Sequence, residues 1–191
     1  LDDLPVGGIY FNGEGFTTTG TDGDVATVEV TDFVLENGQI ASDGYVRVTN
    51  SGLAGGSGQE LLMNGANLLF DFGDPIDGLT FLYHSSGGSL NLMINGDLRL
   101  IADFSALDGG QVGGTLVTVD SLGNGASRVT IEGTIHSFAV GGQELTMDLL
   151  CVPHPGVHVV NVTPGETIGG RNFGNRPESG AIHGTKWFDR D

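Results

Sequence analysis

The hydrophobic residues of this chain fall in short runs, many of them alternating with polar residues, and Gly, Asp, Asn and Ser separate the runs. A period of two is typical of β-strands, and the separating residues are typical of turns. Helical periodicity is almost absent, and the frequent glycines disfavour long helices. We expect strands at residues 8–11, 25–35, 45–50, 61–72, 78–84, 89–94, 98–104, 114–121, 127–138, 145–152 and 157–162.

Two turn signals fix the spacing of these strands. Asn95-Gly96 joins two predicted strands directly, and Asn-Gly is the preferred dipeptide of a type I′ hairpin turn. A Gly-Asn-Gly turn at residues 123–125 joins another pair. About ten short strands at regular spacing are typical of two packed sheets. The sequence therefore predicts an all-β fold, a two-sheet antiparallel β-sandwich.

The composition changes after Val162. Residues 163–180 are rich in Pro, Gly, Asn and Arg, and residues 181–191 form another strand-like run that carries the only Trp. We expect a β-sandwich domain at residues 1–162, a linker at 163–180 and a terminal β-segment at 181–191. A lone strand is satisfied by pairing with a sheet edge, either of its own domain or of a neighbouring copy. The second alternative predicts a homo-oligomer or polymer held by Ile182, Trp187 and Phe188.

The chain is strongly acidic, with a formal net charge of −17 from 24 Asp and Glu against seven Lys and Arg. Nucleic acid and anionic membrane surfaces are excluded as partners, because both need clustered basic residues. No run of about 20 apolar residues exists, so no membrane span is expected. A compact domain this acidic repels itself unless cations screen it. Calcium is the expected cofactor, because Ca²⁺ prefers carboxylate and carbonyl oxygens; the alternative is a merely soluble acidic surface.

The acidic residues gather in turn segments. Alternating oxygen ligands around glycine suit a calcium loop, although the pattern lacks the terminal Glu of an EF-hand. Asp and Gly are also favoured turn residues in any β protein, so each cluster has a plain structural alternative. Asp2-Asp3 is a further acidic pair. The candidate calcium ligands in these clusters are Asp22, Asp24, Asp71, Asp74, Asp77, Asp189 and Asp191.

Enzymatic chemistry finds no support in the sequence. Nucleophilic catalysis needs a base and an orienting acid beside the nucleophile, and the chain has no G-x-S-x-G motif. With 24 acids a carboxylate pair is always available, so a glycosidase is not indicated. Most aromatic residues are Phe in positions expected for the core, and no aromatic platform for sugars is evident. We expect no enzyme activity.

One part of the chain resembles a known family. Residues 79–119 (LTFLYHSSGGSLNLMINGDLRLIADFSALDGGQVGGTLVTV) and 133–152 (GTIHSFAVGGQELTMDLLCV) resemble β-sandwich domains of secreted bacterial proteins, often of the PEP-CTERM type. The jelly-roll fold of those domains is similar to that of carbohydrate-binding modules. The resemblance implies a jelly-roll-like sandwich. Similar modules with a structural calcium imply that Glu14 and Asp148 are neighbouring ligands, provided that the first and last strands pair.

The end of the chain resembles a second family. Residues 157–191 (VHVVNVTPGETIGGRNFGNRPESGAIHGTKWFDRD) resemble the junction before Cna-B or SdrD-like repeats of bacterial surface proteins. In those proteins NFGN ends one module, and G-x-I-x-G-x-x-W-x-D is the first strand of the next. Here Gly180, Ile182, Gly184, Trp187 and Asp189 match that strand. The resemblance implies either an incomplete module, with half of its calcium loop, or an inter-subunit strand.

Together these observations predict an extracellular or cell-surface protein. The first expectation is a calcium-stabilised structural subunit that assembles head-to-tail into a fibre, tube or sheath. The alternative is a carbohydrate-binding or adhesive module of a larger bacterial surface protein, for which a polysaccharide is the partner.

Overall fold

The computed structural model describes residues 1–19, 25–56 and 58–152. The predicted ligands Asp22, Asp24, Asp189 and Asp191 lie outside these residues. The predicted strand at 157–162, the linker and the terminal β-segment lie outside them too. The chain divides into two units, of which the first runs from Leu1 to Pro153. We call residues 1–152 the body.

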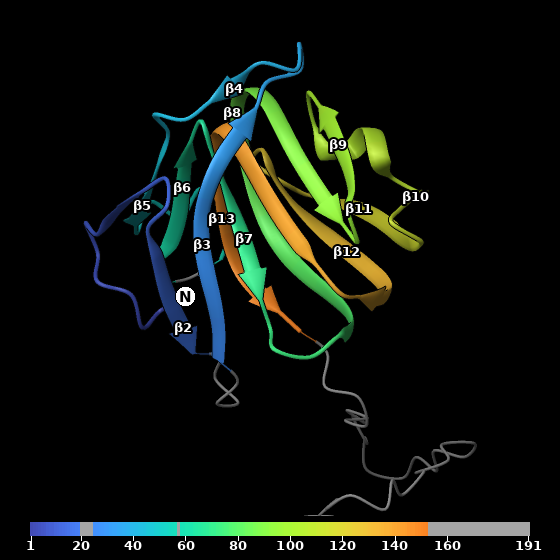
Figure 1. The fold of residues 1–191 in the computed structure, drawn as a ribbon, viewed down its shortest axis with the longest axis horizontal. Coiled ribbons are helices and arrows are strands. Elements are labelled where there is room, and N and C mark those ends of the chain that lie inside the picture. The colour runs from blue at the N-terminus through green and yellow to red at the C-terminus, as the bar shows by residue number, and fades with distance from the viewer. Residues whose placement is uncertain (20–24, 57, 153–191) are drawn as a thin grey trace, which may run out of the picture. The chain divides into compact units, whose positions relative to one another are not determined.

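The described residues form an all-β fold, as the sequence predicts (Figure 1). All strand pairings among them are antiparallel, and no helix among them is long and apolar enough to span a membrane. The jelly-roll connectivity stays a prediction. The elements are β1 (Ile9–Phe11), β2 (Gly15–Thr19), β3 (Val25–Val34), β4 (Ile40–Ala41), β5 (Tyr45–Thr49), β6 (Glu60–Asn64), β7 (Ala66–Asp71), β8 (Ile76–Ile94), β9 (Asp97–Ile101), the 3₁₀ helix η1 (Phe104–Leu107), β10 (Gly110–Val112), β11 (Thr115–Gly123), β12 (Ala126–Ile135) and β13 (Phe138–Cys151).

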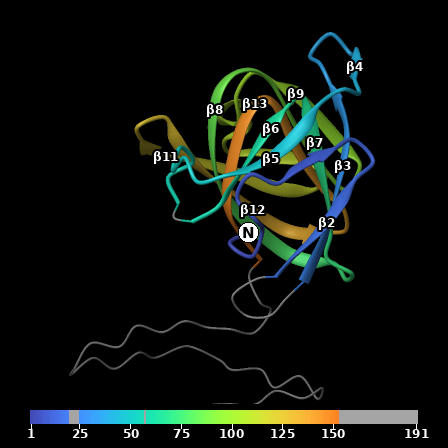
Figure 2. The ribbon, with the colours of Figure 1, turned by 90° about the vertical axis from the view of Figure 1, so that its left-hand side faces the viewer.

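Two long strands, β8 and β13, pair with each other and organise the sheet (Figures 1 and 2). The first half of β13 also pairs with β7, and its second half pairs with β6. On the edge of β8 that faces away from β13, the first half of β8 pairs with β12 and its second half pairs with β9. The strands therefore form two groups that share β8 and β13. One group contains β2, β3, β4, β7 and β9, and the other contains β1, β5, β6, β12, β11 and β10.

The shared strands change partners at one level of the sheet, where glycines lie side by side. The pairing of β13 with β8 shifts register between Gly142 and Leu145, opposite Gly87. The Gly65 N–H, between β6 and β7, donates to the Gly142 carbonyl over 2.9 Å. Register shifts of this kind bend a strand and increase its twist. The bend allows β8 and β13 to pair with strands of both groups.

The strands near this bend differ from the predicted ones in two places. The predicted strand at 61–72 is divided at Gly65, which adopts a φ of +60° that few other residues tolerate. The predicted strands at 78–84 and 89–94 are instead one strand, β8. Residues 85–88 are Ser and Gly, a composition typical of a loop, but cross-strand pairing with β13 keeps them extended.

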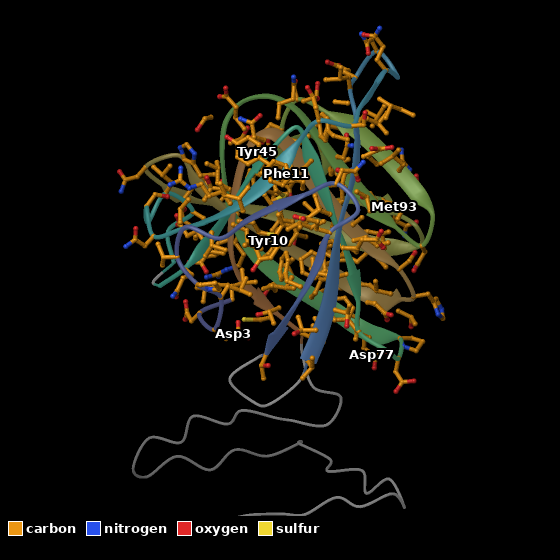
Figure 3. The ribbon with its side chains drawn as sticks, turned by 60° about the vertical axis from the view of Figure 1, so that its left-hand side comes forward. Asp3, Tyr10, Phe11, Tyr45, Asp77 and Met93 are labelled. Atoms are coloured by element: carbon orange, nitrogen blue, oxygen red, sulfur yellow. The ribbon has the colours of Figure 1, made fainter. Side chains whose placement is uncertain are left out.

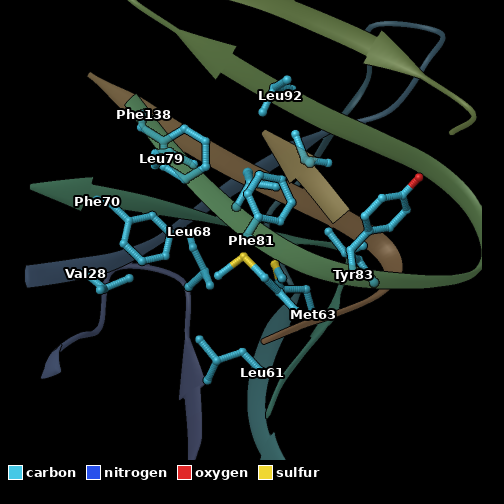
Figure 4. Close-up of a cluster of buried hydrophobic side chains, with 14 of the residues drawn as sticks. Val28, Leu61, Met63, Leu68, Phe70, Leu79, Phe81, Tyr83, Leu92 and Phe138 are labelled. Atoms are coloured by element: carbon cyan, nitrogen blue, oxygen red, sulfur yellow. The ribbon is translucent and has the colours of Figure 1, made fainter. Parts of the chain in front are cut away.

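The buried hydrophobic side chains form one core cluster, part of which Figure 4 shows. Alternation along β3 buries Val28 and Val30 and exposes the residues between them, which confirms the period of two. Phe81 stacks edge-on against Phe104 and lies 6.0 Å from Phe138, measured between ring centroids. Of the phenylalanines expected in the core, Phe72 is only partly buried. The others, Phe33, Phe70, Phe81, Phe104 and Phe138, are buried as predicted.

The hairpin at Asn95-Gly96 is confirmed, because it joins β8 to β9 with Asn95 at a φ of +52°. The Asn95 side chain also ties this turn to two others. Its Nδ2 donates to the carbonyls of Gly113 and Thr134, each over 2.9 Å, and its Oδ1 accepts from the His136 N–H over 2.7 Å. Asn95 therefore sets the hairpin turn and also connects three loops.

Candidate cation site

Two buried carboxylates lie on neighbouring strands beneath a glycine-rich loop. Leu61 of β6 and Met147 of β13 are cross-strand partners whose side chains point into the core. Successive residues of a strand point to opposite faces, so Glu60 and Asp148 lie together on the other face. They are only 1% and 2% exposed, respectively. Like charges that face each other across a sheet destabilise it, so this pair requires a compensating group.

Glu60 holds the loop that covers the pair. Its Oε1 accepts from the Ala54 N–H over 2.9 Å, and its Oε2 accepts from the Leu53 N–H over 3.3 Å and from the Ser51 hydroxyl. Ala54 is fully buried as a result. Glu60 is therefore the anchor of the loop.

Asp148 has no comparable set of partners. Within the described residues, its Oδ1 accepts only from the adjacent Leu149 N–H, over 2.6 Å, and its buried Oδ2 has no hydrogen-bond partner. The Gly56 backbone lies against this oxygen so closely that a Cβ there would be 1.9 Å from it. Leu149 adopts a φ of +46°, beside a register shift between Asp148 and Cys151. An unpartnered buried oxygen of this kind is costly.

A third carboxylate, Asp2, lies near the pair. Its Oδ1 accepts from the Gln59 N–H over 2.8 Å, and a Cβ at Gly58 would meet the same oxygen at 2.0 Å. Burial raises the pKa of Asp148, and the charges of Glu60 and Asp2 raise it further. Asp2, Glu60 and Asp148 form what we call the acid cluster. Its unbalanced negative charge favours binding of a proton or a cation.

Asp3 shows what a satisfied carboxylate looks like in the same domain. It accepts from the Thr18 hydroxyl over 2.7 Å and from the Thr19 N–H over 2.8 Å. Its slight burial acts to raise its pKa, but these hydrogen bonds outweigh that effect and the pKa is lowered. The contrast with Asp148 identifies the missing partners of Asp148 as the distinctive feature of the acid cluster.

The other predicted calcium ligands in the described residues lie apart from the acid cluster. Glu14 accepts from the Phe11 N–H over 2.8 Å in the turn between β1 and β2. β1 pairs with β5, and β13 pairs with β6, β7 and β8, so the strand pairing required to bring Glu14 beside Asp148 is not formed. The predicted neighbourhood of these two residues was wrong, because it assumed the strand order of another module.

The predicted ligands between β7 and β8 are surface residues of a turn. Asp71 accepts from the Gly73 N–H over 2.8 Å, which is the plain turn function of Asp. Asp74 and Asp77 are exposed, and Figure 3 shows Asp77 at the surface of the body. Within residues 1–19, 25–56 and 58–152, no three His, Cys, Asp or Glu side chains form a ready-made metal cage. A cation at the acid cluster would therefore need backbone carbonyls or water as further ligands.

The sequence pointed to Asp148 but not to Glu60. Glu60 follows the glycine-rich segment at 51–59 and precedes an apolar run, a position that resembles any polar residue at the start of a strand. Only the pairing of β6 with β13 shows that Glu60 lies beside Asp148. Asp2 was visible only as one half of the Asp2-Asp3 pair.

Comparison with protein-family models, curated proteins and solved structures found no match for this chain. The resemblances to PEP-CTERM-type and Cna-B or SdrD-like domains therefore stay predictions.

Proposed function

We propose that this chain is an extracellular structural protein of the cell surface. In this proposal, it is a calcium-stabilised β subunit that assembles head-to-tail into a fibre, tube or sheath. The observation that carries the proposal is the acid cluster, in which the buried Oδ2 of Asp148 has no partner among the described residues and lies near two further carboxylates. A protein with this arrangement is stabilised by a cation, and calcium is abundant outside cells.

The charge of the body supports a requirement for cations. Twenty of the 24 acidic residues, but only three of the seven basic residues, precede residue 153. The described residues hold one salt bridge, between Arg99 and Asp97 over 2.8 Å. Protein cations therefore leave most of the negative charge unbalanced. Calcium would neutralise part of this charge, held by Asp148, Glu60 and Asp2 together with loop carbonyls or water.

The C-terminal segment supplies the means of assembly. It carries Ile182, Trp187 and Phe188 as apolar anchors, and four of the seven basic residues lie between Arg171 and Arg190. The chain after residue 153 also carries four acidic residues, so it has no formal net charge and, unlike a second acidic body, is not repelled by the body. A contact between two different surfaces, repeated from copy to copy without closure, builds a fibre.

Negative-stain microscopy of the full chain, with calcium and with a chelator, tests this function. We expect filaments with calcium, and shorter or fewer filaments with the chelator. We expect no filaments from the variant Trp187→Ser/Phe188→Ser, which leaves the body unchanged. Monodisperse monomers under both conditions would contradict the proposal.

A further inference from the structure

Side chains of β1 and β5, at one end of the strand order, form an exposed apolar surface. Phe11 is 54% exposed and Ile9 is 46% exposed, although both are large hydrophobic residues. The Phe11 and Tyr45 rings lie side by side, with centroids 6.5 Å apart (Figure 3). Exposed apolar surface of this kind often marks a binding surface.

Strand register explains why these side chains gather. Phe11 pairs with Tyr45, and Ile9 pairs with Arg47, so all four side chains point to the same outer face. Tyr10, between Ile9 and Phe11, points the other way and packs on Phe16 at 4.6 Å. We call Ile9, Phe11, Tyr45 and Arg47 the β1–β5 face. β1 is also the terminal strand in the order of its sheet, with β5 as its neighbour.

Arg47 gives this apolar face a positive charge in an otherwise acidic body. The body contains only two other basic residues, Arg99 and Arg128. Arg99 forms a salt bridge with Asp97, whereas Arg47 forms no salt bridge within the described residues. The complementary partner is therefore an apolar segment that carries a carboxylate. A second acidic body is disfavoured as the partner, because two strongly negative surfaces repel each other.

We propose that the β1–β5 face is the docking surface for residues 181–191 of a second copy of this chain. Trp187 and Phe188 supply rings for Phe11 and Tyr45. Asp189 and Asp191 follow these rings directly and supply carboxylates for Arg47, while Lys186 and Arg190 face the surrounding acidic surface. This inference rests on the proposed function, since it names the surface through which the subunits join.

The chain between the two partners is long enough for this contact. Residues 153–180 separate the body from the docking segment, and 28 residues span roughly 95 Å when fully extended. That length reaches beyond the surface of a body of this size to a neighbouring one. Contact between copies therefore requires no rearrangement of β1 or β5.

Site-specific cross-linking of the full chain tests the docking surface. Trp187 is replaced by the photo-reactive residue benzoylphenylalanine, and the sample mixes ¹⁵N-labelled and unlabelled protein. We expect cross-linked peptides that join position 187 to β1 or β5, with one labelled and one unlabelled partner. Cross-links confined to one copy, or to other strands, overturn the proposal. Filaments with cross-links elsewhere would leave the proposed function intact, whereas failure to form filaments would remove both.

A charge exchange tests the role of Arg47. We expect Arg47→Glu to lower the filament mass in a sedimentation assay at least fivefold. Arg128→Glu, the same change on β12, is the matched control and leaves the mass unchanged. Combining Arg47→Glu with Asp189→Arg and Asp191→Arg restores assembly. Equal effects of the two single variants, or no restoration, overturn the proposal. So does saturable binding of the full chain to a neutral polysaccharide such as cellulose that Phe11→Ser abolishes while filaments persist.

Discussion

At the scale of single residues, the side chains of Asp148 and Asn95 differ most in their hydrogen bonding. Asp148 is buried beside other carboxylates, and one of its oxygens has no partner in the part of the chain that the structure describes. The Asn95 side chain joins its own turn to two others through its Nδ2 and Oδ1 atoms. The buried carboxylate of Asp148 lowers the stability of the fold, whereas the hydrogen bonds of Asn95 raise it. A tolerated cost of this kind is a common mark of a functional position.

We predict that Asp148→Asn stabilises the protein when calcium is removed. The substitution removes a buried charge that Glu60 and Asp2 repel, so the free energy of unfolding should rise by about 1–2 kcal/mol. Urea denaturation in the presence of a chelator measures the change. Asp74→Asn, at an exposed position, is the control and should have no effect. A loss of stability in Asp148→Asn would mean that the carboxylate has a partner after all.

The pH dependence of stability follows from the raised pKa of Asp148. The folded protein holds this proton more tightly than the unfolded chain does. Stability therefore falls as the pH rises from about 3.9, the ordinary Asp value, to the raised value, and stays lower above it. We expect denaturation midpoints in chelator to show this loss in the wild type. Asp148→Asn should lack it, and an identical pH profile for the two proteins would exclude Asp148 as its source.

We predict that Asn95→Gly destabilises the body even though glycine suits the positive φ. The variant loses the bonds to Gly113, Thr134 and His136, which should lower the free energy of unfolding by about 2–3 kcal/mol. Asn124→Gly is the matched control, because Asn124 also lies in a turn, with a φ of +54°, and makes no side-chain hydrogen bond within the described residues. Thermal denaturation compares the two. Equal melting temperatures would show that the Asn95 bonds contribute nothing.

At the scale of elements, the sequence predicted most strands but not their partners. Alternation in residues 25–35 and the Asn95-Gly96 turn are local signals, and β3 and the β8–β9 hairpin follow from them. The bend shared by β6–β7, β8 and β13 is not local. It depends on the register between distant segments, which places Gly87 opposite Glu144 and the Gly65 N–H against the Gly142 carbonyl. The neighbourhood of Glu60 and Asp148 escaped prediction for the same reason.

The close approach of strands near this bend predicts the effect of Gly141→Ala. Gly141 is the partner of Asn67 on β7 and of Asn91 on β8. A Cβ at position 141 would lie 2.0 Å from the Asn67 Oδ1 and 2.4 Å from the Ala66 carbonyl oxygen. We expect a loss of about 2–3 kcal/mol in unfolding free energy. Ala139→Gly, two residues away on the same strand face, should cost about 0.5–1 kcal/mol. Equal losses would argue against the close approach.

At the scale of the whole molecule, the acidity of the chain is concentrated in the body, and the bases are concentrated at the end. The positions of the charged residues are known from the sequence alone, and they led us to expect cation binding and self-association. The sequence spread the candidate ligands over several clusters. Among the candidate ligands in the described residues, only Asp148 combines burial with an unpartnered oxygen, because turn aspartates such as Asp71 are satisfied by their own turns.

The central claim is that a cation at the acid cluster stabilises the fold. Its most direct test is the free energy of unfolding of the full chain, with calcium and with a chelator, for the wild type and Asp148→Asn. At calcium concentrations about a hundredfold above the dissociation constant, we predict a gain of about 2.7 kcal/mol for the wild type and little or none for the variant. An equal gain in both proteins, or no gain in the wild type, would contradict the claim.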